Sequence, residues 1–147
     1  VAAARTLGRR AIVLRGWAGI AAPDESPDCL TISETNLQAL LARAAVVVHH
    51  GGAGTTQAAA LAGKPSILVP FLGDQTFWAM QLKKLGVSPG SVPRNGWKPE
   101  RLGALMAKAQ QVPELTEKAK QVGEQMRRED GVATAIQMIN DAVASRA

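Results

Sequence analysis

The feature that most constrains the fold of this sequence is the alternation of short apolar runs with helical segments. Apolar runs typical of buried strands lie at 11–17, 30–32, 45–49 and 66–71. Helical patterns lie at 37–44, 57–62, 75–85, 98–110, 113–128 and 132–145. Strands that alternate with helices pair in parallel through right-handed crossovers. The sequence therefore predicts an α/β fold with an open, doubly wound parallel sheet and a helical C-terminus.

The segments that follow the strands are the places to look for a site, because open α/β sheets bind ligands beyond the carboxyl ends of their strands. Here these segments are 16–19, 33–36, 49–55 and 71–75. We expect them to line one rim. Two of them also carry residues that can cap the helix that follows, namely Thr55 or Thr56 in one and Asp74 in the other.

The segment "HHGGAGTT", residues 49–56, joins a predicted strand to a predicted helix. Unpaired backbone N–H groups and the helix dipole favour an anion at such a junction, and we expect a phosphate group as the ligand. Three glycines let the backbone approach a phosphate and adopt positive φ: Gly51, Gly52 and Gly54. His50 can donate from its imidazole, and Thr55 can add a hydroxyl. The alternative is a turn that needs glycines only for its geometry and buries His49 in the core.

Three competing motifs fit this junction less well. A Walker phosphate loop fails because Ala58 stands where its first glycine belongs and Pro65 follows Lys64. The dinucleotide fingerprint fails because position 57 is Gln. Adjacent histidines at a strand end point to opposite faces, and neither a cysteine nor a nearby acid completes a metal site. We therefore expect no metal and no cofactor.

Asp74 and Gln75 end the next segment of the same rim. Their side chains offer two acceptor oxygens and an amide, which suit sugar hydroxyls. The alternative is that Asp74 is only a helix cap and Gln75 a surface residue of the first turn. A phosphate site beside a polyol site suggests a sugar nucleotide as the ligand.

Composition excludes several other classes of protein. The 147 residues fit one domain, and the 17 basic and 12 acidic residues give a net charge of +5 without a basic patch that would indicate nucleic acid binding. Cys29 is the single cysteine, which suits a reducing cytosol. No apolar run approaches the roughly 18 residues of a membrane span. The chain does not begin with Met, and its first residues read as the end of a helix, so we expect it to be part of a longer, cytoplasmic protein.

From Ala11 to Val143 the sequence resembles the C-terminal, nucleotide-sugar-binding domain of glycosyltransferases with the GT-B fold. "HHGGAGT", the following Gly-x-Pro and "DQ" occur in the order and at the separations of the branch that glycosylates glycopeptide antibiotics and sterols. The plant members carry a signature in which a Gln lies 25 residues after a His. Here Gln75 lies 25 residues after His50. The resemblance implies a Rossmann-like domain that binds a nucleoside diphosphate sugar such as UDP-glucose.

The resemblance also assigns the rim residues. It implies that the donor diphosphate binds at the loop residues His50, Gly51, Gly52, Gly54 and Thr55. It places the transferred sugar at Asp74 and Gln75, and the base and ribose at Ser33, Glu34 and Asn36. The stacking Trp of the plant signature is Ile32 here and its ribose-binding Glu is Ala58, so both UDP and TDP donors remain open. Trp17 can stack on the base instead, and the alternative is that Trp17 is partly buried packing.

Family members contain a second, N-terminal domain that holds the acceptor and the catalytic base. We expect this chain to be a single donor-binding domain that lacks that partner domain and the first strand of its own sheet. The implied reaction transfers a sugar to a hydroxyl of a hydrophobic or aromatic acceptor, with no catalytic residue in residues 1–147. Two alternatives stay open: an isolated, non-catalytic nucleotide-binding or structural module, and a GT-B protein with another reaction such as epimerisation. A cut sheet edge would also favour self-association.

Overall fold

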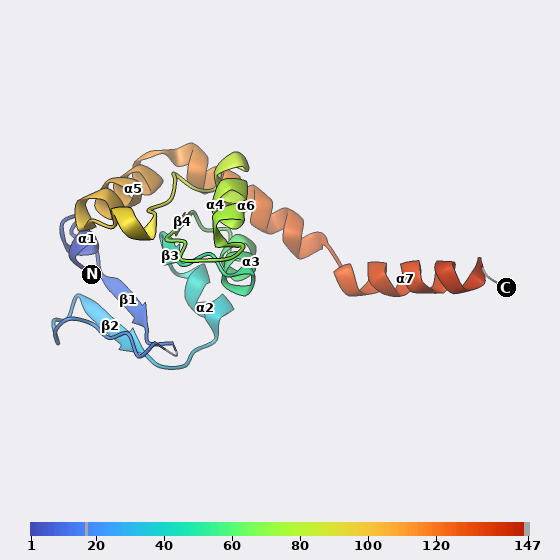
Figure 1. Cartoon of the computed structure of the whole chain (residues 1–147), viewed down its shortest axis with the longest axis horizontal. Helices are drawn as coiled ribbons and strands as arrows, with labels where there is room; N and C mark the ends of the chain where they lie inside the picture. Colours follow the sequence, from blue (N-terminus) through green and yellow to red (C-terminus); the bar gives the residue numbers. More distant parts are fainter. Residues whose placement is uncertain (17, 146–147) are drawn as a thin grey trace.

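The computed structural model describes residues 1–16 and 18–145. Its elements are α1 (Ala2–Arg5), β1 (Ala11–Leu14), β2 (Cys29–Ile32), α2 (Leu37–Ala42), β3 (Val47–His49), α3 (Ala53–Leu61), β4 (Ser66–Leu68), α4 (Gln75–Lys84), the 3₁₀ helix η1 (Arg94–Gly96), α5 (Pro99–Gln111), α6 (Pro113–Arg128) and α7 (Gly131–Ala144). Figure 1 shows a body of strands and helices from which α7 projects. The predicted α/β class with a helical C-terminus is confirmed.

The strands form two separate parallel pairs. β1 pairs with β2, with Ala11 opposite Cys29, and β3 pairs with β4, with Val47 opposite Ser66. A further parallel bridge joins Leu68 of β4 to Ser91. The predicted parallel pairing is confirmed, but the prediction of one continuous sheet is wrong for the described residues, because β1 and β3 each keep one edge without a strand neighbour.

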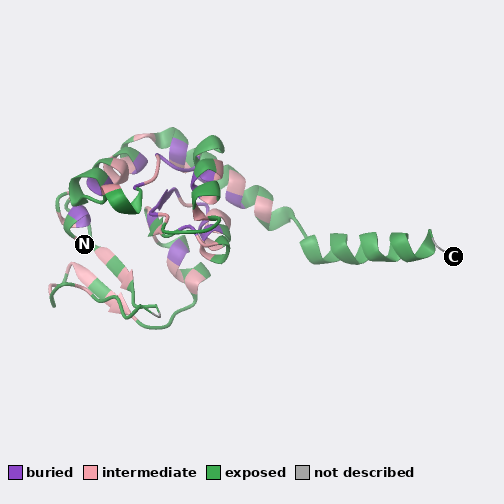
Figure 2. Ribbon diagram, in the orientation of Figure 1, coloured by how far each residue is buried: buried purple, intermediate pink, exposed green. Residues whose placement is uncertain are grey.

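Helices cover both faces of the β3–β4 pair, which forms the centre of the core in Figure 2. On one face Ile67 packs with Ala3 of α1 and Leu102 of α5. On the other face Leu68 packs with residues of α4 and α6. Val47 pairs with Ser66, two residues before Leu68, so its side chain lies on the same face as that of Leu68. There it packs with α2 and α3. The face of α1 and α5 is therefore opposite the face of α2, α3, α4 and α6.

The predicted ends of several elements are wrong; for example, the strand predicted at 66–71 ends at Leu68. The first strand was predicted to reach position 17 but ends at Leu14, and Gly16 then turns the chain with φ +53°. The helix after the glycine loop begins at Ala53, with Gly52 rather than Thr55 or Thr56 at the N-cap and no capping side chain. It starts early because Gly52 is extended, with φ −62° and ψ 142°, and the residues after it are small.

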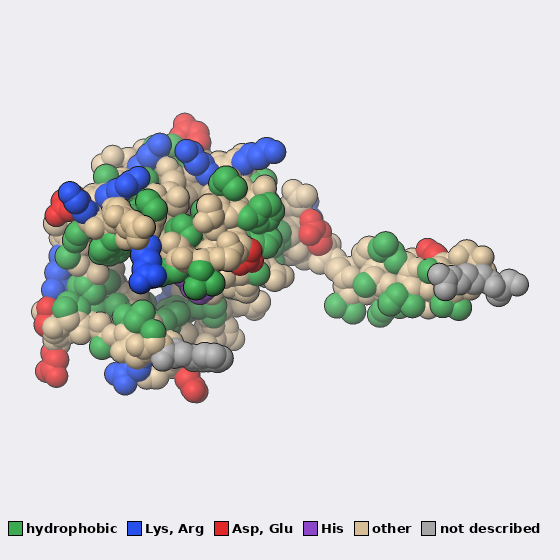
Figure 3. Space-filling model, in the orientation of Figure 1, with side chains coloured by type: hydrophobic (Ala, Val, Ile, Leu, Met, Phe, Trp, Pro, Cys, Tyr) green, Lys and Arg blue, Asp and Glu red, His purple; other side chains and the backbone are tan. Residues whose placement is uncertain are grey.

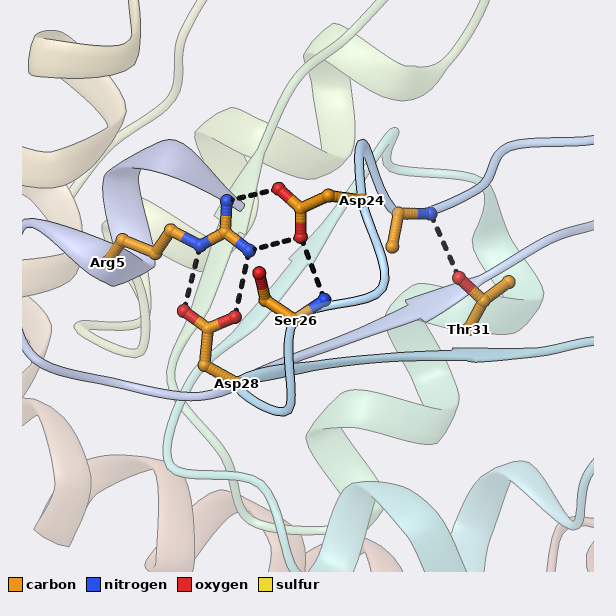
Figure 4. Close-up of polar contacts among 6 residues, drawn as sticks. Arg5, Asp24, Ser26, Asp28 and Thr31 are labelled. Carbon is orange, nitrogen blue, oxygen red and sulfur yellow. Dashed lines mark hydrogen bonds and ion pairs between the residues drawn. The ribbon is translucent and has the colours of Figure 1, made fainter.

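A network of charged groups fastens the loop between β1 and β2 to α1 (Figure 4). The Arg5 guanidinium donates to both carboxylate oxygens of Asp24 and of Asp28, at 2.7 to 2.8 Å. These bonds hold the pKa of both carboxyl groups below their usual range. Earlier in the loop, the Ala22 N–H donates to the Thr31 hydroxyl of β2 at 2.9 Å. The loop is thus tied at two points near the ends of the strands that it joins.

The last helix, α7, has no packing partner among the described residues. All its described residues are exposed, and Figure 3 shows hydrophobic side chains along it. Val132, Ile136, Ile139 and Val143 recur at the spacing of one helix face. None of the helices described in this structure is both long enough and apolar enough to cross a membrane.

Candidate functional site

The glycine loop after β3 is pressed against the start of α4. Gly51 is buried and has φ +98°, a conformation that favours glycine. A Cβ at this position would lie 2.9 Å from Leu68 Cδ2 and 3.2 Å from the Gln75 carbonyl oxygen. A side chain at position 51 would therefore separate the two segments. The loop that was predicted to hold phosphate and the segment that was predicted to hold sugar are direct neighbours.

His50 lies beside the N-terminus of α3. A Cβ on Gly52 would come within 2.5 Å of His50 Nε2, so the absence of a side chain at position 52 makes room for the imidazole ring. Gly54 is exposed, and a Cβ there would meet nothing within 4 Å. The first helical bond of α3 runs from the Thr56 N–H to the Gly52 carbonyl. The N–H groups before it in the first turn of α3 lack helical acceptors, and the surface at Gly54 is uncrowded.

The neighbouring His49 has a structural role. Its Nδ1 accepts a hydrogen bond from the Gly51 N–H at 3.2 Å, so the proton of the neutral ring is on Nε2. Burial, together with a smaller contribution from the nearby His50, lowers the pKa of His49 to about 4. Nε2 is buried without a hydrogen-bond partner among the described residues, as is the Thr56 hydroxyl. His49 therefore stabilises the turn as a neutral, half-buried side chain, in agreement with the alternative that the sequence left open for it.

Asp74 and Gln75 are both engaged in local hydrogen bonds. Gln75 Oε1 accepts from the Phe71 N–H at 2.7 Å and from the Leu72 N–H at 3.2 Å, which closes the loop after β4. Asp74 Oδ2 accepts from the Trp78 indole N–H at 2.8 Å. Asp74 occupies the N-cap position of α4, but its predicted capping bond is absent because its backbone is helical and its carboxylate is turned to the indole. Asp74 Oδ1 and Gln75 Nε2 remain free of these bonds.

The predicted base and ribose residues follow β2. Ser33 and Glu34 are exposed in a bend, and Asn36 is the N-cap of α2, where its Oδ1 accepts from the Ala39 N–H at 3.1 Å. This bond commits the Asn36 oxygen to the helix. α2 packs against α3 through Leu41 and Ala59, which brings the segment after β2 to the helix that begins at the glycine loop. Trp17 lies outside the described residues.

Sequence reasoning missed two further residues of this region. Phe71 is exposed three residues after the end of β4, and the Arg94 guanidinium carbon lies 5.8 Å from the centroid of its ring. Arg94 belongs to η1, which follows the bridge residue Ser91. The available signal for Phe71 was an aromatic residue at the end of the predicted strand 66–71, at the start of the predicted rim segment 71–75. Within residues 1–16 and 18–145 no three His, Cys, Asp or Glu side chains gather as metal ligands would.

Residues 18–141 match the family described as erythromycin biosynthesis protein CIII-like, C-terminal domain. The vancomycin aglycone glucosyltransferase of Amycolatopsis orientalis is 43% identical over 144 residues, which are 96% of this chain and 34% of that protein. A sterol 3-beta-glucosyltransferase of Arabidopsis thaliana is 34% identical over 130 residues, 87% of this chain and 21% of that protein. The chain thus spans about a third or less of the length of these relatives.

Solved structures show the same fold. The spinosyn rhamnosyltransferase SpnG superposes with a TM-score of 0.81 at 18% identity, covering 95% of this chain and 38% of that one. The same protein complexed with thymidine diphosphate gives a TM-score of 0.76 at 21% identity, covering 95% and 39%. At these identities the likeness concerns the fold, and it confirms the predicted match to the C-terminal half of GT-B glycosyltransferases.

Proposed function

The chain belongs to the family of erythromycin biosynthesis protein CIII-like C-terminal domains, and we propose that it is the donor-binding part of a glycosyltransferase. Its ligand is a nucleoside diphosphate sugar with UDP or TDP. The observation that carries this proposal is the open N-terminus of α3, with His50 beside it and Gln75 against the Gly51 backbone. The relatives named above are glucosyltransferases, and one solved structure of the same fold is a complex with thymidine diphosphate.

The diphosphate binds at the glycine loop. The free N–H groups of the first turn of α3 and the imidazole of His50 donate to the phosphate oxygens, and Thr55 adds its hydroxyl. Gly54 leaves the space that the diphosphate needs, because no atom crowds that position. When the sugar leaves, negative charge grows on the diphosphate, and these fixed donors stabilise it without reorganisation. The loop therefore contributes to the reaction as well as to binding.

The sugar binds at Asp74 and Gln75, which offer opposite hydrogen-bonding roles. Gln75 Oε1 is occupied by two backbone N–H groups, so Gln75 faces the ligand with its amide donors. Asp74 has one carboxylate oxygen left to accept. A pair of sugar hydroxyls fits this arrangement when one donates to Asp74 and the other accepts from Gln75. Ser33, Glu34 and Asn36, with Trp17, are proposed for the base and ribose.

The acceptor and the catalytic base are proposed to lie in a further domain. In a protein that includes it, the sugar moves to a hydroxyl of a hydrophobic or aromatic acceptor, an antibiotic aglycone or a sterol being the chemistry named for the relatives. The proposed sites of residues 1–147 hold the donor and contain no base for the acceptor. The competing function is a non-catalytic nucleotide-binding or structural module, which binds without turnover.

The unpaired edges of β1 and β3 support a further strand in the longer protein. α2 and α3 lie on the same face, so right-handed crossovers place β2, β3 and β4 in one direction across the sheet. α1 lies on the opposite face, so a crossover through α1 runs in the other direction. A strand that precedes α1 therefore lies on the β3 side of β1. We propose the strand order β2, β1, added strand, β3, β4.

Amide hydrogen exchange tests this strand order. The Ala11 and Val47 N–H groups bond to Asp28 and Pro65, so the alternate N–H groups of Ile12 and Val48 face the open edges. In the isolated chain the Ile12 and Val48 amide protons should exchange fast. In a longer protein that contains the added strand, the same amide protons should be protected. Slow exchange at both positions in the isolated chain would contradict the proposal. Light scattering at several concentrations checks whether the open edges cause self-association.

Calorimetric titration with UDP, TDP and AMP tests the donor site. Each nucleotide is added to the wild-type chain, to His50→Ala and to the control Gln125→Ala, an exposed change on α6. We expect a pyrimidine diphosphate to bind the wild type and the control, and its affinity to fall about 10-fold or more in His50→Ala, as the loss of a hydrogen bond to a charged group implies. Equal affinity in His50→Ala would refute the site, and a folded chain that binds none of the three would refute independent donor binding.

A further inference from the structure

Trp78 stands out among the residues near the proposed sugar site because it connects that site to the core. It lies one helical turn after Asp74 on α4. Its ring packs against the buried cluster of β4, α4 and α6, and it meets the Phe77 ring edge to face, with centroids 5.3 Å apart and planes at 74°. The indole N–H then donates to Asp74 Oδ2 at 2.8 Å. The body of Trp78 is therefore held by packing while its one polar atom holds the carboxylate.

Asp74 has a competing position for its carboxylate. An Asp at an N-cap ordinarily accepts from the backbone N–H groups two and three residues later. Here no such bond forms, although Asp74 occupies that position in α4. Among residues 1–16 and 18–145, the indole N–H is the single hydrogen-bond donor to this carboxylate. Without it, the carboxylate can turn back toward the helix N-terminus, away from the orientation found here.

We propose that Trp78 is a positioning residue that fixes the Asp74 carboxylate for the sugar of the donor, an inference that rests on the proposed function of Asp74. The fixed indole engages one carboxylate oxygen and leaves the other to accept from a sugar hydroxyl. Because the side chain is oriented before the ligand arrives, binding spends no free energy on ordering it. Trp78 acts through Asp74 and makes no contact with the sugar itself.

The test separates positioning from packing with two substitutions on α4. Trp78→Phe keeps an aromatic ring at the position and removes the N–H donor. Phe77→Leu is the control, because it removes the aromatic partner of Trp78 and leaves the hydrogen bond. NMR couplings between the α and β protons of Asp74 report whether its side chain holds one rotamer. We expect the same single rotamer in the wild type and in Phe77→Leu, and in Trp78→Phe either averaged couplings or the different rotamer of a capping Asp74. Retention of the wild-type rotamer in Trp78→Phe would overturn the proposal.

Binding supplies the second readout. UDP-glucose is compared with UDP, and TDP-glucose with TDP, so that the ratio of the two dissociation constants isolates the sugar. The nucleotide sugar should bind more tightly than the nucleotide, and Trp78→Phe should reduce this ratio of affinities about 3- to 10-fold, as the loss of one hydrogen bond implies. In an Asp74→Ala background the same substitution should change nothing, since Trp78 acts through Asp74. An equal loss in both backgrounds would overturn the positioning role.

The failure of the proposed function is distinguishable from the failure of this inference. A wild-type chain that binds neither nucleotide nor nucleotide sugar counts against the donor site, while the Asp74 couplings still decide whether Trp78 orients the carboxylate. If Trp78→Phe does not fold, Asp74→Ala tests the same bond from the other side. The Trp78 indole proton should then exchange faster with water than in the wild type, and an unchanged rate would overturn the inference.

Discussion

β4 and β1 are both short apolar strands, yet they lie in opposite environments. Ile67 of β4 is 0% exposed, whereas Ile12 and Leu14 of β1 are 52% and 38% exposed. β4 lies between β3 and the bridge at Ser91, and helices cover both of its faces. β1 has one strand neighbour among the described residues. The comparison shows that burial here depends on the neighbours of a strand, because the apolar character of the two strands is alike.

Substitution of one isoleucine in each strand should give the largest difference. Ile67→Ala removes a fully buried side chain and should lower the free energy of unfolding by about 2–5 kcal/mol. Ile12→Ala removes a half-exposed side chain, and its cost should stay below about 1 kcal/mol. Urea denaturation of both variants measures the two values. Equal costs would mean that β1 is as well packed as β4 in solution.

Two helix glycines sharpen the comparison within the part of the chain that packs around β3 and β4. A Cβ on Gly123 of α6 would lie 2.8 Å from the Ala60 carbonyl oxygen and 2.9 Å from Gly63 Cα, so Gly123→Ala should destabilise the chain by about 1–3 kcal/mol. Gly103 of α5 has its nearest atom at 3.8 Å. Gly103→Ala should be neutral or stabilise by up to about 1 kcal/mol, because alanine favours the helix. Thermal unfolding of the matched pair decides whether α3 and α6 are in the close contact described here.

Acid should destabilise the part of the chain around β3 and β4 through His49. Burial lowers the pKa of His49 from 6.5 to about 4, so the unfolded chain takes up a proton at a higher pH than the folded one. The free energy of unfolding should therefore fall as the pH is lowered from about 6.5 to about 4. The urea midpoint across this interval measures the effect, and His49→Gln should flatten it. NMR titration of the His49 ring near 6.5 would contradict the burial.

The smallest effect is expected from the charged network beside β1. Arg5 lowers the pKa values of Asp24 and Asp28. The stabilisation of the folded state by these ion pairs is therefore present above the ordinary carboxyl pKa of 3.8 and is lost as the pH falls below it. Exchange of the amides of β1 and β2 should accelerate in this interval, and those of β4 should not respond. Arg5→Gln should remove the response of β1. Because the pairs are exposed, high salt should weaken it too.

The sequence predicted the strands, the helices and the main loop of the candidate site because their signals are local. The apolar run of β4, the glycines of the loop and the heptad-like face of α7 are each visible within a few residues. The separation of β1 from β3 is not local, since it depends on what lies between two strands that are far apart in the chain. An apolar run predicts a strand, but it does not indicate whether both edges of that strand pair with other strands.

The hydrogen bonds of the proposed sugar site were also beyond the sequence. Asp74 before a helix is a common capping residue, and the structure gives its carboxylate to Trp78 instead. Gln75 was predicted to offer its whole amide, and its oxygen closes the loop after β4. In both residues two local bonds compete, and packing of the surrounding side chains decides between them. His50 was predicted as a site residue from its motif, but its place over Gly52 depends on the backbone of the turn, which the motif does not specify.

The central claim is that the glycine loop after β3 holds a nucleoside diphosphate, and NMR chemical-shift mapping tests it most directly. The isotope-labelled chain is titrated with TDP and with UDP, and the amide shifts of every residue are followed. The largest changes should fall on residues 50–55 at the start of α3, with smaller changes on 33–36 and 71–75. Changes centred on the far side, in the groove between α4, α5 and α6 around Gly86 and Pro113, would contradict the claim.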